Sequence, residues 1–468
     1  MNNHIKVAVR NLLKKKAFSA INILGLALGL ATSILIFLWV RDEYSMDAFH
    51  QNGSRLYRIY KTNHVEGKLV GGPGTPPLLP AEIKKVIPEI EASSGFSWDD
   101  THTFAAGEKI IKEKGYNASP DFFRMFSYRL LAGKAEEALN TPESIAISQA
   151  MALEFFGSPL AAVGKTIRCD NQKDYMVKAV FEDVSFSSTE RFNYIANWDS
   201  FMEANKGWAM DWGNNGPRTY IMLRQGANPA LVEKKIARFL DKYDKGQRKG
   251  FESTLGMQPY NELYLHGNFE NGQPAGGRIE YVRLFGLVAI FILLIACINF
   301  MNLTTAHSMR RAKEIGVRKV MGAVRAALVR QFIGEAVLVA LVSGILAMAF
   351  VSLALPAFNQ LTGKQIELPY SNAGFWLLVA GLVIVTGIVS GSYPALFLSG
   401  FNPIRVLKGT LTPGTGSTWF RKSLVVFQFV LSIVLIISTI LISRQINYIQ
   451  TANLGYDREN LLYIPLEG

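Results

Sequence analysis

The sequence is poor in cysteine and in charge, and both shortages narrow the classes of protein that it can encode. Cys169 and Cys297 are the two cysteines in 468 residues, which excludes a disulfide framework. Charged residues make up 18% of the chain, against 49% for hydrophobic residues. Long apolar runs therefore decide the fold class, and they predict an α-helical membrane protein.

Five apolar runs are long enough to cross a bilayer as helices, because about 20 such residues span its hydrocarbon core. None of them has a Lys, Arg or Asp near its centre. They lie at residues 17–40, 281–305, 331–355, 375–398 and 423–443. The first run continues into Arg41 without a small-residue cleavage site, so we expect a retained anchor rather than a cleaved signal peptide.

The net charge of +12 is concentrated beside the ends of these runs. Residues 1–16, 306–330 and 399–422 together contain 16 basic residues and one acidic residue, Glu314. The positive-inside rule places these three segments in the cytoplasm and residues 41–280 outside. The basic charge is therefore a topology signal, and we expect contacts with membrane lipids and no binding of nucleic acid.

Residues 41–280 have the mixed strand and helix pattern of an extracytoplasmic α/β domain. We predict two similar flanks, one with a strand at 55–60 and a helix at 80–90, the other with a strand at 219–223 and a helix after it. The apolar face of the second helix is predicted to comprise Leu231, Val232, Ile236, Phe239, Leu240 and Tyr243.

A subdomain is expected between these flanks, at about residues 141–215, which makes the whole a split βα domain. Residues 144–156 have the pattern of a strand followed by a helix, and a hairpin is expected to turn at Asp170 and Asn171. The same region is rich in aromatic residues that form either a core or, less favoured, a contact surface for a lipid, peptide or glycan. These are Phe192, Tyr194, Trp198, Phe201, Trp208 and Trp212.

Motifs that could support catalysis are scarce. Residues 157–166 end in the Gly-Lys-Thr of a phosphate-binding loop, but Pro159 occupies the place of that loop's first glycine. The six histidines lack the paired spacing of a metal site, and no Gly-x-Ser-x-Gly elbow occurs. We therefore predict no catalytic, cofactor-binding or metal site in this chain.

Two membrane runs carry pairs of glycines four residues apart, a spacing that lets helices approach closely. The first run contains Gly25 and Gly29, and the fourth contains Gly387 and Gly391. We predict helix packing at all four positions.

The basic segment at 306–330 contains more than the Lys and Arg residues that a membrane flank requires. Glu314 and Arg318 form a favourable i,i+4 pair, and apolar residues alternate with the charges. Gly316 and Gly322 would allow another surface to come close. From these residues alone, a short docking helix and a simple charged flank both remain open.

Residues 314–323 resemble the coupling segment of MacB/FtsX-type ABC transporter permeases. Residues 392–396, followed by Pro403 and residues 407–409, are similar to the end of that family's fourth span. Residues 10–12, ahead of the first span, also fit, as does one large external domain between the first two spans.

This resemblance implies a permease subunit of the bacterial inner (plasma) membrane, with its N-terminus in the cytoplasm. A separate cytoplasmic ABC ATPase would hold the ATP and grip the coupling segment, and motion of the external domain would drive export or lipoprotein release. The residues implied for coupling are Glu314, Ile315, Gly316, Val317, Arg318, Lys319 and Gly322.

The resemblance also implies further partners: a dimer or a second permease half, and a periplasmic adaptor or an outer-membrane protein. The alternative is an envelope-sensing or hydrolase-activating membrane scaffold of the same architecture.

The fifth run points to an internal repeat. Residues 454–464 follow a basic flank and a span in the same way as residues 49–59 do. We expect 444–468 to begin a second extracytoplasmic repeat, so that the chain is the front part of a two-repeat permease; a coincidental strand is the alternative. Residues 1–16 form either an amphipathic surface helix or a basic flank.

Overall fold

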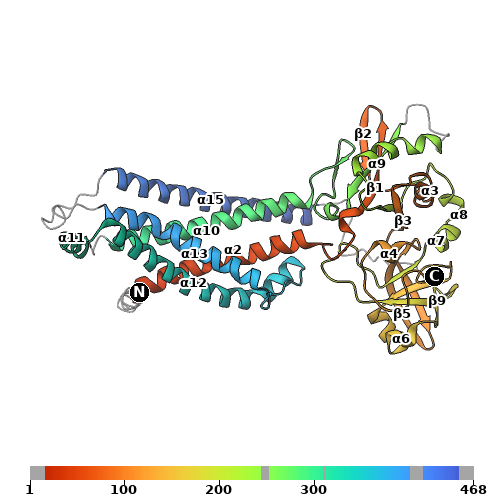
Figure 1. Cartoon of the computed structure of the whole chain (residues 1–468), viewed down its shortest axis with the longest axis horizontal. Helices are drawn as coiled ribbons and strands as arrows, with labels where there is room; N and C mark the ends of the chain where they lie inside the picture. The colour runs from red at the N-terminus through yellow and green to blue at the C-terminus, as the bar shows by residue number, and fades with distance from the viewer. Residues whose placement is uncertain (1–15, 244–251, 309–311, 401–414, 453–468) are drawn as a thin grey trace. The chain divides into compact units, whose positions relative to one another are not determined.

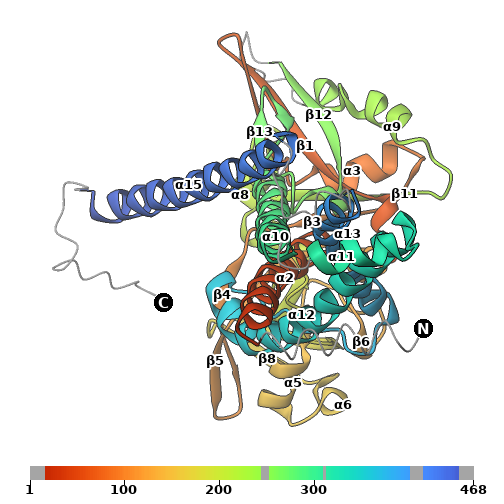
Figure 2. The same cartoon turned by 90° about the vertical axis from the view of Figure 1, so that its left-hand side faces the viewer.

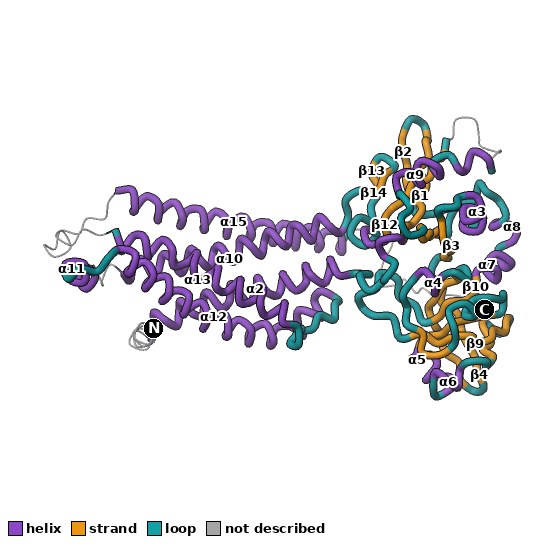
Figure 3. Tube along the Cα trace, viewed as in Figure 1, coloured by secondary structure: helices purple, strands orange, loops and turns teal. Residues whose placement is uncertain are grey.

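The computed structural model describes residues 16–243, 252–308, 312–400 and 415–452. The expected amphipathic segment apart from Lys16, most of the linker at 399–422 and residues 453–468 of the expected second repeat lie outside these residues. Residues 444–451 of that repeat are helical. The chain divides into two compact units, one of Met1–Arg41 with Arg283–Glu467 and one of Asp42–Val282. Figure 3 shows that the strands of the described chain all belong to the second unit, here called the sheet unit; the first is called the helical unit.

The helical unit contains five helices long and apolar enough to cross a membrane, as predicted (Figure 1). They are α2 (Lys16–Ser45), α10 (Arg278–Ser308), α12 (Arg325–Thr362), α13 (Ala373–Ser399) and α15 (Thr415–Thr451). Each extends beyond its predicted run, because helix geometry continues into polar flanks that a hydropathy window excludes. A short basic helix, α11 (Ala312–Val320), lies between α10 and α12 in the sequence.

The core of the helical unit is formed by the first four long helices (Figure 2). Leu30 of α2, Ala340 and Ala347 of α12 are fully buried, and Phe375 of α13 is nearly so. By contrast, none of the apolar window of α15 is buried. A helix that is apolar on all sides and is not buried by its own chain must be covered by lipid or by another chain.

The sheet unit is built on one twelve-stranded sheet with the order β10-β7-β9-β8-β4-β5-β3-β11-β1-β12, in which β2 pairs with β1 and β6 with β9. The strands are β1 (Leu56–Val65), β2 (Lys68–Gly72), β3 (Ile90–Phe96), β4 (Asp100–Ala106), β5 (Lys109–Ala118), β6 (Leu130–Ala132), β7 (Ser144–Ser148), β8 (Thr166–Cys169), β9 (Lys173–Phe181), β10 (Tyr194–Asn197), β11 (Arg218–Leu223) and β12 (Ser253–Pro259). A small hairpin, β13 (Phe269–Glu270) with β14 (Gln273–Pro274), forms a separate two-stranded sheet, and Thr62 of β1 donates to the Gly272 carbonyl in its turn.

Six of these strands close into a small barrel, because β10 pairs in parallel with β5 on one side and antiparallel with β7 on the other. The ring runs β5-β10-β7-β9-β8-β4 and back to β5. Phe104, Ile145 and Val177 are fully buried in its core. The barrel takes in β4 and β5, so the subdomain expected at about 141–215 also draws strands from residues 100–118.

The two flanks form the other part of the sheet, where β1 pairs antiparallel with β11. Ile221 points to the side covered by α3 (Leu79–Val86) and α9 (Pro229–Ile236), and its neighbour Tyr220 points to the opposite core. This alternation follows the pleat of a strand with apolar cover on both faces. The split βα arrangement is the one predicted.

Two helix predictions need correction. The helix expected at 80–90 ends at Val86, because Pro88 disfavours helical geometry at Ile87, which is extended with φ −106° and ψ 102°. The second helix ends at Ile236, and residues Phe239–Lys242 form a separate 3₁₀ turn. Leu231 is 56% exposed, because it lies on the opposite side of the helix from Val232 and Ile236.

The insert contains the predicted local elements. Strand β7 is followed by α5 (Gln149–Phe156), and the hairpin of β8 and β9 turns at Asp170 and Asn171, both with positive φ. Most of the aromatic stretch is core, as favoured: Phe192, Tyr194, Trp198 and Phe201 are buried. Trp208 and Trp212 are half-buried.

Candidate functional site

The candidate site is α11 with the turn that follows it, which together contain the predicted coupling residues 314–322. The helix is closed at its C-terminal end by Gly322, whose φ is +94°, with its amide donating to the Lys319 carbonyl at 3.1 Å. Such left-handed ends strongly favour glycine, because it has no Cβ. Gly322 thus ends the helix and starts the turn into α12.

One side of α11 packs against α12 and α13. Ile315 is 3% exposed and contacts a cluster in the helical unit that includes Leu328 and Phe332 of α12 and Ala395 and Leu398 of α13. Gly316 beside it is also buried. This inner side fixes α11 to the ends of two membrane helices.

Polar contacts reinforce the inner side. The Lys319 ammonium donates to the Ser399 carbonyl at 2.6 Å, which satisfies a carbonyl at the C-terminal end of α13. Arg325 donates to the Ser399 hydroxyl at 3.3 Å, and Arg318 donates to the Gln331 side chain at 3.2 Å. Burial and the nearby charge of Arg325 lower the pKa of Lys319.

The opposite side of α11 and the turn after it present apolar side chains to solvent. Val317 is 46% exposed, Val320 65%, Met321 79% and Val324 64%. Isolated exposed apolar residues need no explanation, but four exposed apolar side chains within eight positions of a basic segment are a candidate contact surface. This set is called the outer face of α11.

The structure therefore divides the predicted coupling residues into two groups. Ile315, Arg318 and Lys319 contact other helices of the helical unit, and Gly316 is buried, whereas Val317 is on the outer face. The side chain of Glu314 lies outside the described residues, so its pairing with Arg318 stays a prediction. Val320, Met321 and Val324 belong to the outer face but are missing from the sequence-based set of coupling residues. Val320 and Met321 directly precede the end-capping Gly322, and Val324 lies two residues after it.

The four predicted packing glycines all lie at helix contacts. A Cβ at Gly29 would lie 2.4 Å from the Ala296 Cβ of α10, and a Cβ at Gly25 would lie 3.5 Å from the side-chain nitrogen Nδ2 of Asn299. In α13, the corresponding atoms would lie 2.7 Å from Val337 Cα for Gly387 and 2.5 Å from Ala336 Cβ for Gly391. Gly29, Gly387 and Gly391 leave no room for a larger residue.

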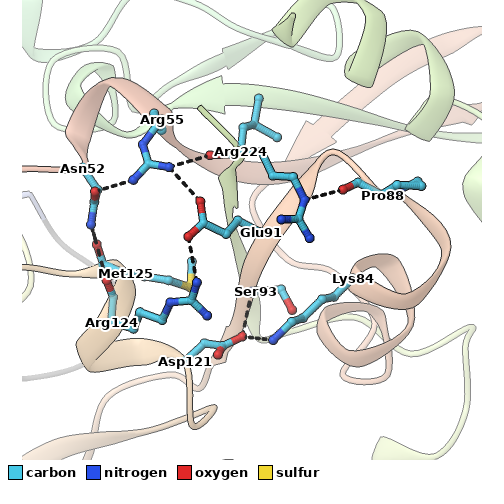
Figure 4. A network of polar contacts seen from close by, with 11 residues as sticks. Asn52, Arg55, Lys84, Pro88, Glu91, Ser93, Asp121, Arg124, Met125 and Arg224 are labelled. Atoms are coloured by element: carbon cyan, nitrogen blue, oxygen red, sulfur yellow. Dashed lines mark hydrogen bonds and ion pairs between the residues drawn. The ribbon is translucent and has the colours of Figure 1, made fainter. Parts of the chain in front are cut away.

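Within the sheet unit, the segment that follows α2 is tied down by polar contacts (Figure 4). Glu91 of β3 accepts from Arg55 at 2.8 Å and from Arg124 at 2.7 Å, and Arg55 also donates to Asn52 at 2.7 Å. Burial alone would raise the pKa of Glu91, but the two arginines outweigh it and lower that pKa.

A second contact of this segment is made by Asp47, whose side chain is buried. Its carboxylate accepts from the Thr189 amide at 2.9 Å and from the Thr189 hydroxyl at 2.5 Å, and its own amide donates to the Ser187 carbonyl at 2.8 Å. Glu190, next in the chain, forms an ion pair with Arg218. The residues that follow α2 are therefore rigidly bonded inside the sheet unit.

The phosphate-loop resemblance at 157–166 has no structural support. In such loops the Gly-Lys-Thr leads into a helix whose N-terminus faces the phosphates. Here Thr166 instead begins strand β8, and the only helix within the run, α6 (Pro159–Ala162), has four residues.

The histidine spacing in the sequence did not reveal one cluster of possible metal ligands in the sheet unit. Pairing of β4 with β8 brings His102 next to Cys169 and Asp170, residues that are more than 60 positions away in the sequence. Only the strand register reveals this, although the predicted hairpin turn at Asp170 was a partial signal.

Five apolar helices and an α/β domain inserted between the first two of them define a multi-pass membrane protein with an extracytoplasmic domain. Residues 19–239 match the MacB-like periplasmic core domain, and residues 286–403 match the FtsX-like permease C-terminal domain. The chain belongs to the ABC transporter permeases of the MacB/FtsX type.

Individual relatives are distant. The chain is 23% identical to the ABC transporter permease YvrN of Bacillus subtilis, over 87% of this chain and 100% of that one. It is 24% identical to the macrolide export ATP-binding/permease protein MacB of Agrobacterium fabrum, over 74% of this chain but about half, 52%, of that protein. A permease domain from Porphyromonas gingivalis aligns with a TM-score of 0.39 at 19% identity, covering 50% of this chain and 98% of that domain.

Proposed function

We propose that this permease subunit couples ATP hydrolysis by a separate cytoplasmic ABC ATPase to motion of its extracytoplasmic unit. The observation that carries the proposal is the outer face of α11, an exposed apolar surface on a helix whose other side is fixed to α12 and α13. An apolar helix face of this kind fits a groove on a partner protein.

Contacts on the inner side of α11 would transmit force from a partner protein to the membrane helices. Because Ile315 packs against both α12 and α13, and Lys319 holds the last carbonyl of α13, a push on the outer face would act on two membrane helices together. Because close-packed interiors transmit strain, these buried contacts would pass a displacement of α11 on to α12 and α13.

We further propose that the chain works in the bacterial inner membrane with its N-terminus in the cytoplasm, in export or lipoprotein release. Several relatives are named macrolide export proteins, which supports export. The unburied α15 supports a second permease half or a dimer partner alongside it, and an adaptor or outer-membrane protein would join from the outside.

The test is purification of the tagged full-length protein from its native membrane, with identification of the chains that accompany it. We expect an ABC ATPase in the wild-type sample. Val320→Asp with Met321→Asp should reduce the retained ATPase by at least about tenfold, which corresponds to about 1.4 kcal/mol, because two contact residues become charged.

A matched control is Leu160→Asp, which changes an equally exposed apolar residue, 80% exposed, in the sheet unit. Retention of the ATPase should be unchanged in this control. Full retention in the α11 double variant would contradict the proposed docking surface, and absence of any ATPase from the wild-type sample would favour the scaffold alternative.

A further inference from the structure

Three side chains of the kinds that bind metals lie together in the barrel of the sheet unit. His102 comes from β4, Cys169 ends β8, and Asp170 starts the turn after β8. One ligand atom from each lies within 4.8 Å of the other two. Imidazole nitrogen, thiolate sulfur and carboxylate oxygen form a donor set that suits Zn²⁺ and other borderline-soft divalent ions.

The backbone holds this cluster in place. Strands β4 and β8 pair with Phe104 opposite Cys169, which brings the turn after β8 beside His102. The Asp170 amide donates to the Thr103 carbonyl at 2.8 Å, and the Thr103 amide donates back to the Asp170 carboxylate at 2.8 Å. Asp170 and Asn171 both have left-handed φ, +48° and +55°, and the turn they form is closed by the Gln172 amide, which donates to the Cys169 carbonyl at 2.9 Å.

The charges around the cluster favour a cation. The Asp170 carboxylate lies 2.5 Å from His102 Nδ1, and the Asp100 carboxylate lies 3.6 Å from His102 Nε2. Lys173, the neighbouring cation, donates to the Ser200 hydroxyl at 2.8 Å. The His102 and Asp170 side chains are about one-third exposed, at 32% and 37%, so an ion could reach the buried thiol from solvent.

We propose that His102, Cys169 and Asp170 bind a borderline-soft divalent ion such as Zn²⁺, with water completing its coordination. Asp100 lies beside Nε2, on the other edge of the His102 ring from the nitrogen that faces Asp170, and would orient the ring rather than bind the ion. Tetrahedral zinc, with bonds of about 2.0 Å to nitrogen or oxygen and about 2.3 Å to sulfur, places ligand atoms about 3.3–3.5 Å apart. The widest separation between ligand atoms, up to 4.8 Å, must therefore shrink by about 1.3–1.5 Å, and the ion must separate His102 Nδ1 from the Asp170 carboxylate.

Binding exchanges one proton for one ion at the thiol. Burial, with the charges of Asp170 and Asp100, raises the pKa of Cys169 to about 12, so the free thiol is protonated near neutral pH. The ion displaces that proton to solvent and binds the thiolate. The product is a cross-link between β4 and the hairpin of β8 and β9, across one seam of the barrel.

The experiment titrates Co²⁺ into full-length, tag-free protein in detergent after treatment with a chelator. Wild type should bind one equivalent, with a thiolate-to-cobalt charge-transfer band and the visible bands of tetrahedral cobalt, and Zn²⁺ should displace it. Cys169→Ser should lose the charge-transfer band. His102→Ala should weaken binding by at least about tenfold.

Cys297→Ser is the matched control, because it removes the chain's other buried cysteine, and its Co²⁺ spectrum should equal that of wild type. Zn²⁺ should also raise the melting temperature of wild type but not of Cys169→Ser. A wild type without a thiolate band, or a band that survives in Cys169→Ser, would overturn the site.

If Cys169→Ser does not fold, Asp170→Asn decides the matter, because Asn also tolerates the left-handed turn. Binding that is undiminished in Asp170→Asn would overturn the site, and binding that is weakened at least about tenfold would support it.

Discussion

At the scale of single residues, burial sets the protonation state of His50. This histidine is 4% exposed, its Nδ1 accepts from the Ser127 amide at 3.1 Å, and it packs against the rings of Tyr128 and Tyr260. Burial lowers its pKa to about 4, so the neutral ring is the folded form above that pH.

The sheet unit should therefore lose stability as the pH falls. The unfolded chain takes up a proton at His50 near pH 6.5, whereas the folded chain does so only near pH 4. The contribution of the neutral His50 ring to the free energy of unfolding is fully present above about pH 6.5. It falls by about 3 kcal/mol by pH 4. Hydrogen exchange of the residues around 50–60 at pH 7 and pH 5 would measure this loss.

His50→Phe should flatten this pH dependence, even if it lowers stability at every pH by losing the bond from Ser127. His64→Gln is the control, since His64 lies at the end of β1 and should leave the pH dependence as in wild type. An equal drop between pH 7 and pH 5 in wild type and His50→Phe would show that other groups control acid stability.

At the scale of elements, close packing of α12 and α13 depends on the glycines of α13. Gly391→Val places a Cβ 2.5 Å from Ala336 Cβ, so the helices must separate. We expect the helical unit to lose about 1–3 kcal/mol, measured by unfolding in a denaturing detergent. Gly381→Val adds the same side chain to the same helix where nothing lies within 4 Å, and it should stay within about 0.5 kcal/mol of wild type. Equal losses in both variants would point to helix propensity rather than packing.

The elements that could be predicted from the sequence are those set by local pattern. Apolar runs of membrane length predicted the long helices, and alternating strands with turn residues predicted the hairpin at Asp170. The closed barrel could not be predicted, because the pairing of Tyr194 with Gly115 joins strands that are far apart in the sequence. The same holds for the candidate site, since only the end of α13 explains why Lys319 points inward to Ser399.

At the scale of the whole molecule, the charge distribution predicts that the sheet unit and α11 lie on opposite sides of the membrane. Two positions of nearly equal exposure test this, Leu160 in the sheet unit at 80% and Met321 beside α11 at 79%. Each is changed to cysteine in a Cys169→Ser, Cys297→Ser background, and spheroplasts are treated with a membrane-impermeant maleimide.

We expect Leu160→Cys to react in intact spheroplasts and Met321→Cys to react only after the membrane is permeabilised. The matched exposure matters, because a difference in labelling then reports the side of the membrane rather than burial. Reaction of Met321→Cys in intact spheroplasts would place α11 outside, out of reach of any cytoplasmic ATPase, and would remove the basis for coupling through its outer face. If neither position reacts before the membrane is permeabilised, the sheet unit lies on the cytoplasmic side. That outcome would contradict the positive-inside assignment.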